Sequence, residues 1–435
     1  MRTPPLGWLG IARLGLVQAS IGAIVMLTTS LLNRVMVVEY ALPAAVPAGL
    51  VAWHYAVQLS RPLWGHGSDR GRRRTTWIVG GMVVLGSGAM LAVSSVGVLA
   101  ARPVLGGAIA VAAFALIGAG VGAAGTSLLA LLAACVAPAR RQAAAAITWT
   151  MMIAGIAATA GIAGSLIDPF TLTRLVAVAG GVVAAALGVT MLALRGMEPV
   201  GAQISPAPDA PTPGFLPAIC ETLAEPATRR FTLFVFFSML AYSMQDLILE
   251  PFAGLLFGFT PGQSTQMSGA QHGGALAGML LAGIAGNAFA GLPQRGWIAG
   301  GCIASAAALA GLAAAAGHAP AWPLTLNVVL LGLGNGVFTV AAVGAMITLA
   351  GADGGSREGL RLGVWGAAQA IAFGLGGLTG AVAVDLLRGL MGSTREAFVI
   401  VFAIEALLFL LAARLGASAI PRTHAHAFEP AGALA

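Results

Sequence analysis

Apolar runs recur along the whole chain, and this feature constrains the fold more than any other. Each run has about 20 residues, which is long enough to cross a bilayer as a helix. Hydrophobic residues make up 58% of the 435-residue chain, and the mean hydropathy is +0.91. The short alternating segments of an outer-membrane barrel are absent from the sequence. The sequence therefore predicts an all-α polytopic membrane protein.

Twelve such runs are present, and each predicts one transmembrane helix. The expected spans are 13–38, 44–64, 75–98, 103–136, 142–167, 172–194, 231–255, 265–287, 296–316, 322–350, 358–385 and 396–415. A Pro-rich stretch with few bulky apolar residues separates the sixth span from the seventh, and predicts a semi-extended linker. The predicted units are an N-terminal six-helix half (1–196), a cytoplasmic linker (197–229), a C-terminal six-helix half (230–417) and a cytoplasmic tail (418–435).

The arginines predict the orientation of the chain. All 22 basic residues are Arg, and the formal net charge is +7. With both termini in the cytoplasm, only five arginines lie away from that side: Arg34, Arg102, Arg174, Arg388 and Arg395. This is the positive-inside distribution, so the charge excess indicates topology rather than nucleic-acid binding. The three scattered cysteines form no CxxC, and they support neither a disulfide framework nor a zinc site.

The two predicted halves repeat one another in sequence. LIGAGVG (116–122) matches LLGLGNG (330–336), and NRVMVVE (33–39) is echoed by QDLILE (245–250). An Asp also follows a Trp by 19 or 20 residues in each half: Trp149 to Asp168 and Trp365 to Asp385. The matches share offsets of about 211 to 217 residues, which is typical of a duplicated bundle with a cavity between its halves.

The segment GHGSDRGRRR (65–74) joins the second and third spans. It resembles the loop signature of the major facilitator superfamily, in which a Gly, an Asp four residues later and following basic residues latch two helices. The resemblance implies a cytoplasmic latch of five residues: Gly65, Asp69, Arg70, Arg72 and Arg73. Gly71 follows Arg70 directly, one residue earlier than in the usual pattern. The alternative is a basic loop that only fixes topology.

Two segments carry a more specific resemblance: NRVMVVEYALPAAVPAGLVAWHYAVQLSRPLWGHGSDRGRRRT (33–75) and QDLILEPFAG (245–254). They look like the bacteriochlorophyll delivery branch of that superfamily, which includes PucC-like and LhaA-like assembly proteins. The resemblance covers essentially the whole chain. It implies a major facilitator fold in the bacterial inner (intracytoplasmic) membrane. It also implies that the protein handles bacteriochlorophyll during assembly of light-harvesting or reaction-centre subunits, without catalysis.

Two histidines are candidate ligands for the pigment. Bacteriochlorophyll carries a central Mg²⁺, which an imidazole, a carbonyl or a water usually holds axially. His54 and Gln58 are four residues apart and share one helical face, where Trp53 packs nearby. His272 falls in a comparable part of the eighth span, and the neighbouring Gln271 offers a carbonyl oxygen. The alternative is that each histidine is a hydrogen-bonded packing residue.

Four charges are expected at the periplasmic mouth, because Arg34 and Glu39 end the first span while Asp246 and Glu250 end the seventh. Charges at such depth are costly and normally pair. The cluster is either a structural clasp that closes the mouth or a proton-coupling site. Glu405 is the one carboxylate plainly inside a span, and the sequence names no partner for it.

Two other functions compete with pigment delivery. A proton-coupled secondary transporter of a small solute would use the carboxylates of the mouth cluster. An enzyme would need a nucleotide loop, a nucleophile–base pair or a metal cluster, and the sequence supports none of these. The two GxGxG motifs lie inside apolar helices with no preceding strand, so they indicate tight helix packing.

Overall fold

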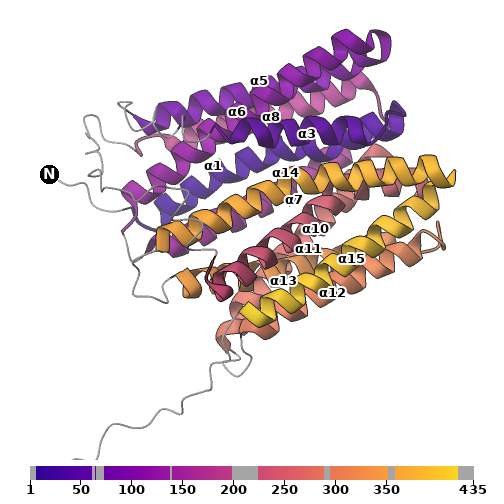
Figure 1. Ribbon diagram of the computed structural model, residues 1–435. Coiled ribbons are helices and arrows are strands. Elements are labelled where there is room, and N and C mark those ends of the chain that lie inside the picture. The colour runs from indigo at the N-terminus through magenta and orange to yellow at the C-terminus, as the bar shows by residue number, and fades with distance from the viewer. Residues whose placement is uncertain are drawn as a thin grey trace, which may run out of the picture.

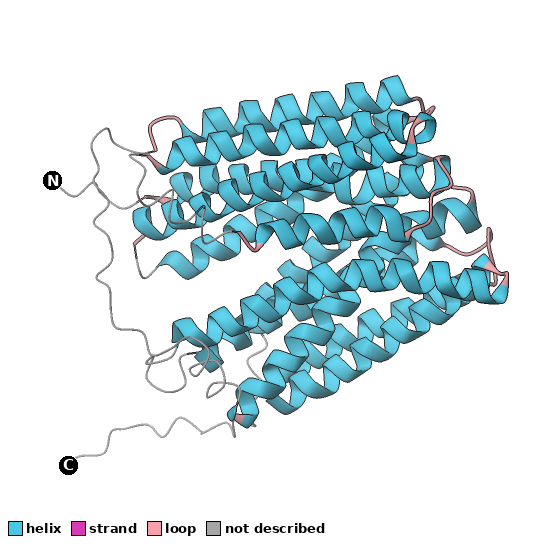
Figure 2. Ribbon diagram, turned by 45° about the horizontal axis from the view of Figure 1, so that its top comes forward, coloured by secondary structure: helices cyan, strands magenta, loops and turns pink. Residues whose placement is uncertain are grey.

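The structure is a computed structural model that describes residues 6–60, 64, 73–137, 140–197, 224–288, 294–350 and 358–419. Within these ranges every regular element is helical (Figure 2). The helices run side by side as one bundle, with the chain crossing back and forth along it (Figure 1). The all-α polytopic prediction is confirmed.

Six continuous helical segments, here called rods, belong to the N-terminal half. The first rod is continuous but changes type along its length: α1 (Trp8–Met26), π-helical η1 (Leu27–Leu31), α2 (Leu32–Arg34) and π-helical η2 (Val35–Glu39). The other five rods are α3 (Ala45–Gln58), α5 (Arg74–Ala101), α6 (Pro103–Cys135), α7 (Arg141–Ile167) and α8 (Leu172–Leu194). The sequence predicts the rods but not the two π-helical segments.

The C-terminal half supplies the other six rods. They are α10 (Pro226–Phe257), α11 (Pro261–Ala288), α12 (Gln294–Ala315), α13 (Leu324–Ala350), α14 (Glu358–Met391) and α15 (Thr394–Ala419). The described residues thus form the twelve expected rods, most of them extended by a few residues beyond the predicted spans. Ten helices are long and apolar enough to cross a membrane. The other two are α3, described over 14 residues, and α11, which begins with the polar run PGQSTQ.

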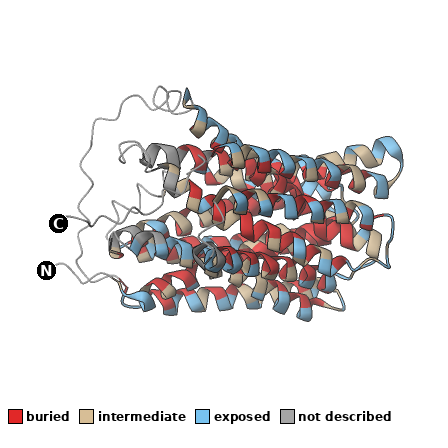
Figure 3. Cartoon of the chain, turned by 90° about the horizontal axis from the view of Figure 1, so that it is seen from below, coloured by how far each residue is buried: buried red, intermediate tan, exposed pale blue. Residues whose placement is uncertain are grey.

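Local sequence sets several helix ends. Pro103, Pro226 and Pro261 each open a helix at a position where a missing N–H costs nothing. Thr171 caps α8 by accepting a hydrogen bond from the Arg174 N–H at 3.1 Å. The apolar side chains on the outer faces are exposed, as lipid contact requires, while buried residues line the inner faces (Figure 3).

The GxGxG motifs allow close helix packing, as the sequence predicts. A Cβ on Gly118 of α6 would lie 2.5 Å from the carbonyl oxygen of His54 on α3. In the other half, a Cβ on Gly332 of α13 would overlap the carbonyl oxygen of Gln271 on α11. Only glycine fits at both positions, since the neighbouring backbone occupies the space of a side chain.

The two halves meet along two helix pairs: α7 packs against α11, and α3 against α14. One end of the bundle, here called the mouth end, carries Glu39, Ala45, Asp168 and Phe259. The opposite end, here called the linker end, carries Met197, the first residue of the predicted linker. In Figure 1 the mouth end lies on the right and the linker end on the left.

Candidate functional site

A proline inside α10 creates a polar contact between the halves. Pro251 has no N–H, so the carbonyl of Leu247, four residues earlier, loses its usual helical partner. Asn33 of α2 replaces that partner, because its Nδ2 donates to the Leu247 oxygen at 2.7 Å in a buried position. The backbone group that the proline frees therefore binds the N-terminal half.

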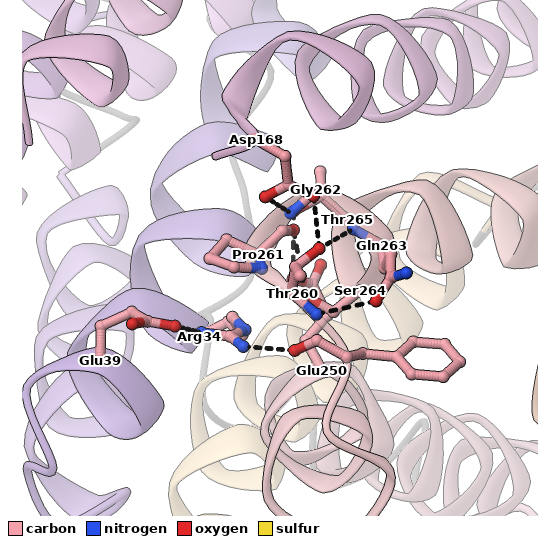
Figure 4. Close-up of polar contacts among 11 residues, drawn as sticks. Arg34, Glu39, Asp168, Glu250, Thr260, Pro261, Gly262, Gln263, Ser264 and Thr265 are labelled. Atoms are coloured by element: carbon pink, nitrogen blue, oxygen red, sulfur yellow. Dashed lines mark hydrogen bonds and ion pairs between the residues drawn. The ribbon is translucent and has the colours of Figure 1, made fainter. Parts of the chain in front are cut away.

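Arg34 lies one residue further along and is almost fully buried. Its Nη1 donates to Glu39 at 2.5 Å, and its Nη2 donates to the Phe259 carbonyl in the α10–α11 turn at 2.6 Å. A π-helix repeats at i to i+5 rather than i to i+4, so η2 returns Glu39 to the side of Arg34. Figure 4 shows Arg34 beside Glu39. The ion pair stays within the N-terminal half, and the carbonyl contact crosses to the other half.

Glu250 is hydrogen-bonded by hydroxyl groups and lies within electrostatic range of Arg34. Ser30 of η1 donates a short hydrogen bond to Oε1 of its carboxylate. Thr265 of α11 donates to Oε2 at 3.4 Å, and Ser268 lies 3.2 Å from the Ser30 hydroxyl. The Glu250 side chain is buried. Hydrogen bonds from three hydroxyls replace part of the hydration that a buried carboxylate loses.

The structure spreads the four predicted charges along the interface. The sequence places Asp246 and Glu250 near the end of their helix, but α10 continues to Phe257. Asp246 therefore lies a full turn deeper than Glu250, where it interacts electrostatically with His272. Among these four residues, the one ion pair joins Arg34 and Glu39.

His272 of α11 is buried, with 8% of its surface exposed. Its Nδ1 lies 2.9 Å from the carbonyl oxygen of Ser268, one turn earlier. A carbonyl only accepts, so this nitrogen carries a proton, and in the neutral imidazole Nε2 keeps its lone pair. Among the described residues, no hydrogen bond to Nε2 of His272 is formed. Gln271 beside it is buried against α13.

His54 is engaged differently. Its Nε2 lies 2.8 Å from the Gln58 amide nitrogen, and both side chains are buried. The amide nitrogen can only donate, so in this arrangement it occupies the lone pair of His54 Nε2. Trp53 turns away from both, is 43% exposed, and donates its indole N–H to the Val111 carbonyl at 3.2 Å.

Aromatic rings link the halves beside these histidines. Tyr55 packs edge-on against His54, with ring centroids 5.0 Å apart. Phe373 of α14 lies 6.0 Å from the Tyr55 ring and 5.8 Å from the Tyr242 ring of α10. Tyr242 also lies within electrostatic range of Asp246. A chain of neighbours thus runs from Tyr55 on α3 through Phe373 on α14 to Tyr242 on α10, and from there through Asp246 to His272 on α11.

Most of the predicted cytoplasmic latch lies outside the described residues: Gly65, Asp69, Arg70 and Arg72. Arg73 immediately precedes α5 in an extended conformation. The neighbouring Arg74, the last residue of that basic segment, is buried. Its Nη1 donates to the Ala130 carbonyl of α6 at 2.5 Å.

Asp385 of α14 caps a helix of the other half. The helix α3 has Ala44 at its N-cap position and no side-chain cap of its own. The first N–H of α3, from Ala45, donates instead to Asp385 Oδ2 at 2.7 Å. A carboxylate at a helix N-terminus satisfies an orphan donor and favours the helix dipole.

Asp168, the partner of Asp385 in the sequence repeat, belongs to the N-terminal half and caps a helix of the C-terminal half. It follows α7 and accepts from the Gly262 N–H at the start of α11 at 3.1 Å. Thr260 donates its hydroxyl to the same carboxylate, and a Cβ on Gly262 would overlap that group. Figure 4 shows Asp168 above this turn. Two pseudo-equivalent carboxylates therefore tie α7 to α11 and α14 to α3 at the mouth end.

Sequence reasoning missed the hydroxyl residues that surround Glu250. Ser30, Thr265 and Ser268 look unremarkable because membrane helices often carry such residues bonded to their own backbone. One signal was available. Thr265, Ser268 and His272 repeat at three and four residues, which places them on one face of α11.

The sequence is similar to proteins of photosynthetic bacteria. The PUCC protein family matches residues 31–422. The chain is 50% identical to the bacteriochlorophyll synthase 44.5 kDa chain of Rhodobacter capsulatus, covering 95% of this chain and 96% of the relative. It is 31% identical to Protein PucC of the same species, covering 92% of this chain and 90% of the relative.

The fold resembles solved transporters. A bacterial homologue of the human lysosomal transporter Spinster, in an inward-facing conformation, matches with a TM-score of 0.68 at 16% identity, over 95% of this chain and 98% of that one. The peptide transporter POT matches with a TM-score of 0.66 at 15% identity, over 95% and 97%. Likeness at such identities concerns the fold alone. The chain is a member of the PUCC family, built on the twelve-helix major facilitator fold.

Proposed function

We propose that this protein binds bacteriochlorophyll, or a late precursor, and delivers it to light-harvesting or reaction-centre subunits without catalysing a reaction. The half-identical relative is named for bacteriochlorophyll synthase, and the family links the chain to that pigment's biology. The transporter-like fold suits a carrier rather than a catalyst. In this proposal both termini lie in the cytoplasm, and the bundle spans the bacterial inner (intracytoplasmic) membrane.

The state of His272 carries the proposal. A histidine that ligates a metal usually donates its other ring N–H to a carbonyl or carboxylate, which fixes the tautomer and aims the lone pair. His272 has that arrangement through Ser268. Its Nε2 would hold the Mg²⁺ of the pigment, which supplies the axial coordination site. Tyr55, Tyr242 and Phe373 offer flat apolar surfaces for a macrocycle nearby.

The other sequence candidates receive smaller roles in this proposal. Gln58 occupies the lone pair of His54. In this proposal His54 therefore positions Tyr55 and does not ligate the metal. Trp53 lies on the outer face, where it meets lipid or a partner subunit. Gln271 supports His272 through the close α11–α13 packing.

A second candidate, proton-coupled transport of a small solute, is favoured by Glu250. A buried carboxylate hydrogen-bonded to hydroxyls of both halves suits a group that gains and loses a proton as the halves separate. Replacement by Gln separates the two functions. In the carrier proposal E250Q keeps its pigment, whereas a proton-driven flux would be abolished.

The test is an absorption spectrum of protein purified in detergent from a bacteriochlorophyll-producing host. We expect pigment to co-purify with the unaltered chain. His272→Leu is expected to retain at least about tenfold less pigment, because axial ligation is lost. His54→Leu is the matched control, since it also removes a buried histidine, and it is expected to keep the pigment. Equal pigment in both variants would refute the ligand assignment. A colourless unaltered protein that also fails to retain antenna subunits would refute the carrier function.

A further inference from the structure

Three buried polar side chains in the C-terminal half have unpaired atoms. Glu405 of α15 and Gln245 of α10 have no exposed surface, and Asn335 of α13 is 2% exposed. Within the described residues, neither carboxyl oxygen of Glu405 has a hydrogen-bond partner. The same holds for both amide atoms of Gln245 and for Nδ2 of Asn335. Buried polar groups are rarely left unpaired, because each costs free energy that water would otherwise supply.

The contacts between α10 and α15 fix how these two helices lie against each other. The rings of Phe252 and Phe398 lie 5.2 Å apart. Nearer the linker end, a Cβ on Gly416 would lie 3.0 Å from the ring of Phe234. From the first contact to the second, the residue numbers fall along α10 and rise along α15. The two helices are therefore antiparallel.

These two contacts place Gln245 and Glu405 opposite each other. Gln245 is seven residues from Phe252 and eleven from Phe234 along α10. Glu405 is likewise seven residues from Phe398 and eleven from Gly416 along α15. Because seven and eleven residues are about two and three whole turns, both side chains lie on the contacting faces. Equal spacings on both helices put them at the same level.

Asn335 reaches that level from α13. Phe338 and Phe409 pack with ring centroids 5.6 Å apart. Asn335 precedes Phe338 by three residues, and Glu405 precedes Phe409 by four, along helices that run in the same direction. The axial offset is therefore about 1.5 Å. Three helices thus place one carboxylate and two carboxamides at about the same level of an apolar core.

Asn335 can turn an oxygen to this cluster. Ser305 Oγ lies 2.8 Å from the assigned Oδ1 of Asn335. Exchanging the amide oxygen and nitrogen keeps that contact, because a hydroxyl both donates and accepts, and it makes Oδ1 the unpaired atom. Glu405, Gln245 and Asn335 can then each offer an unpaired oxygen at this level.

We propose that this cluster binds a monovalent hard cation, Na⁺, through the Glu405 carboxylate and the amide oxygens of Gln245 and Asn335. No salt bridge within the described residues includes Glu405, so its charge needs a small cationic partner. Carboxylate and amide oxygens are the ligands that hard cations prefer. A proton on Glu405 would supply one donor, whereas a cation engages all three side chains at once. This site is independent of the proposed pigment function.

The test compares the thermal unfolding midpoint of the purified full-length protein in NaCl and in choline chloride at equal ionic strength. Binding to the folded state stabilises it by mass action, so we expect the midpoint to rise by about 3–6 °C in NaCl. Glu405→Gln removes the charge at nearly constant shape and is expected to abolish this rise. Glu396→Gln removes an exposed carboxylate of the same helix and is expected to retain it.

Three results would overturn the site. The first is an equal midpoint in the two salts for the unaltered protein. This result stands even if E405Q does not fold. A sodium-dependent rise that persists in E405Q would place the cation elsewhere. A midpoint that responds to pH through Glu405 but not to sodium would show that the group carries a proton instead.

Discussion

At the residue scale, the contact between Asn33 and the carbonyl freed by Pro251 makes a reciprocal prediction. Asn33→Leu leaves the Leu247 carbonyl buried without a donor, which costs about 1–3 kcal/mol. Pro251→Ala restores the N–H that bonds this carbonyl within α10. We therefore expect N33L to lower the thermal midpoint and N33L/P251A to recover most of the loss. A double variant no more stable than N33L would contradict this account.

The sequence contains both halves of this contact but does not reveal it. Asn33 and Pro251 stand inside the two segments that carry the family resemblance, yet 214 residues separate Asn33 from the carbonyl it binds. Helical periodicity assigns a residue to a face, and it cannot name the partner of a single carbonyl. The pairing of Arg34 with Glu39 was equally hidden, because it depends on a π-helical turn that apolar spacing does not encode.

At the element scale, the two carboxylate caps predict different responses to truncation. The helix α3 has no cap of its own, so Asp385→Ala leaves the Ala45 N–H without its acceptor, at a cost of roughly 1 kcal/mol. The helix α11 has an internal cap, in which Thr260 and Gln263 bond each other's backbone N–H at 3.0 and 3.1 Å. It should therefore keep most of its first turn in Asp168→Ala.

Residue-resolved amide hydrogen exchange measures this difference. We expect D385A to speed exchange at Ala45. We expect D168A to speed exchange at Gly262 while Gln263 stays protected. Asp385→Asn keeps an acceptor oxygen and is the matched control, with exchange close to that of the unaltered protein. Loss of protection at Gln263 in D168A would show that the internal cap does not hold α11 by itself.

The elements themselves were largely predictable. Each described rod matches one predicted span, because hydrophobic runs without breakers mark membrane helices directly. The start of α10 differs by five residues, since Pro226 opens a helix before its apolar run begins. The caps were not predictable. Asp168 and Asp385 fall in register in the sequence repeat, but a repeat does not say which N-terminus each carboxylate meets.

At the scale of the whole molecule, the family and the twelve-helix fold were predictable from two segments and a loop, whereas the contacts that close the mouth end were not. Its closure depends on contacts between halves that the sequence separates widely. Asp168 meets α11, Asp385 meets α3, and Glu250 meets Ser30. In a bundle whose halves are joined in this way, the mouth end opens only when these contacts break together.

This arrangement predicts how a water-soluble maleimide reacts at the mouth end. Ser264, in the first turn of α11, has no exposed surface, so Ser264→Cys is expected to react slowly in a chain whose three native cysteines are replaced by alanine. Adding D168A and D385A removes both carboxylate contacts between the halves and should speed that reaction at least about tenfold, since a hydrogen bond to a charged group contributes about 1.5 kcal/mol or more and 1.4 kcal/mol is already a factor of ten. Glu396→Cys, exposed at the same end, should react equally in both backgrounds. Unchanged labelling of S264C without the two aspartates would mean that the other contacts between the halves, such as those of Glu250 and Arg34, hold the mouth end closed.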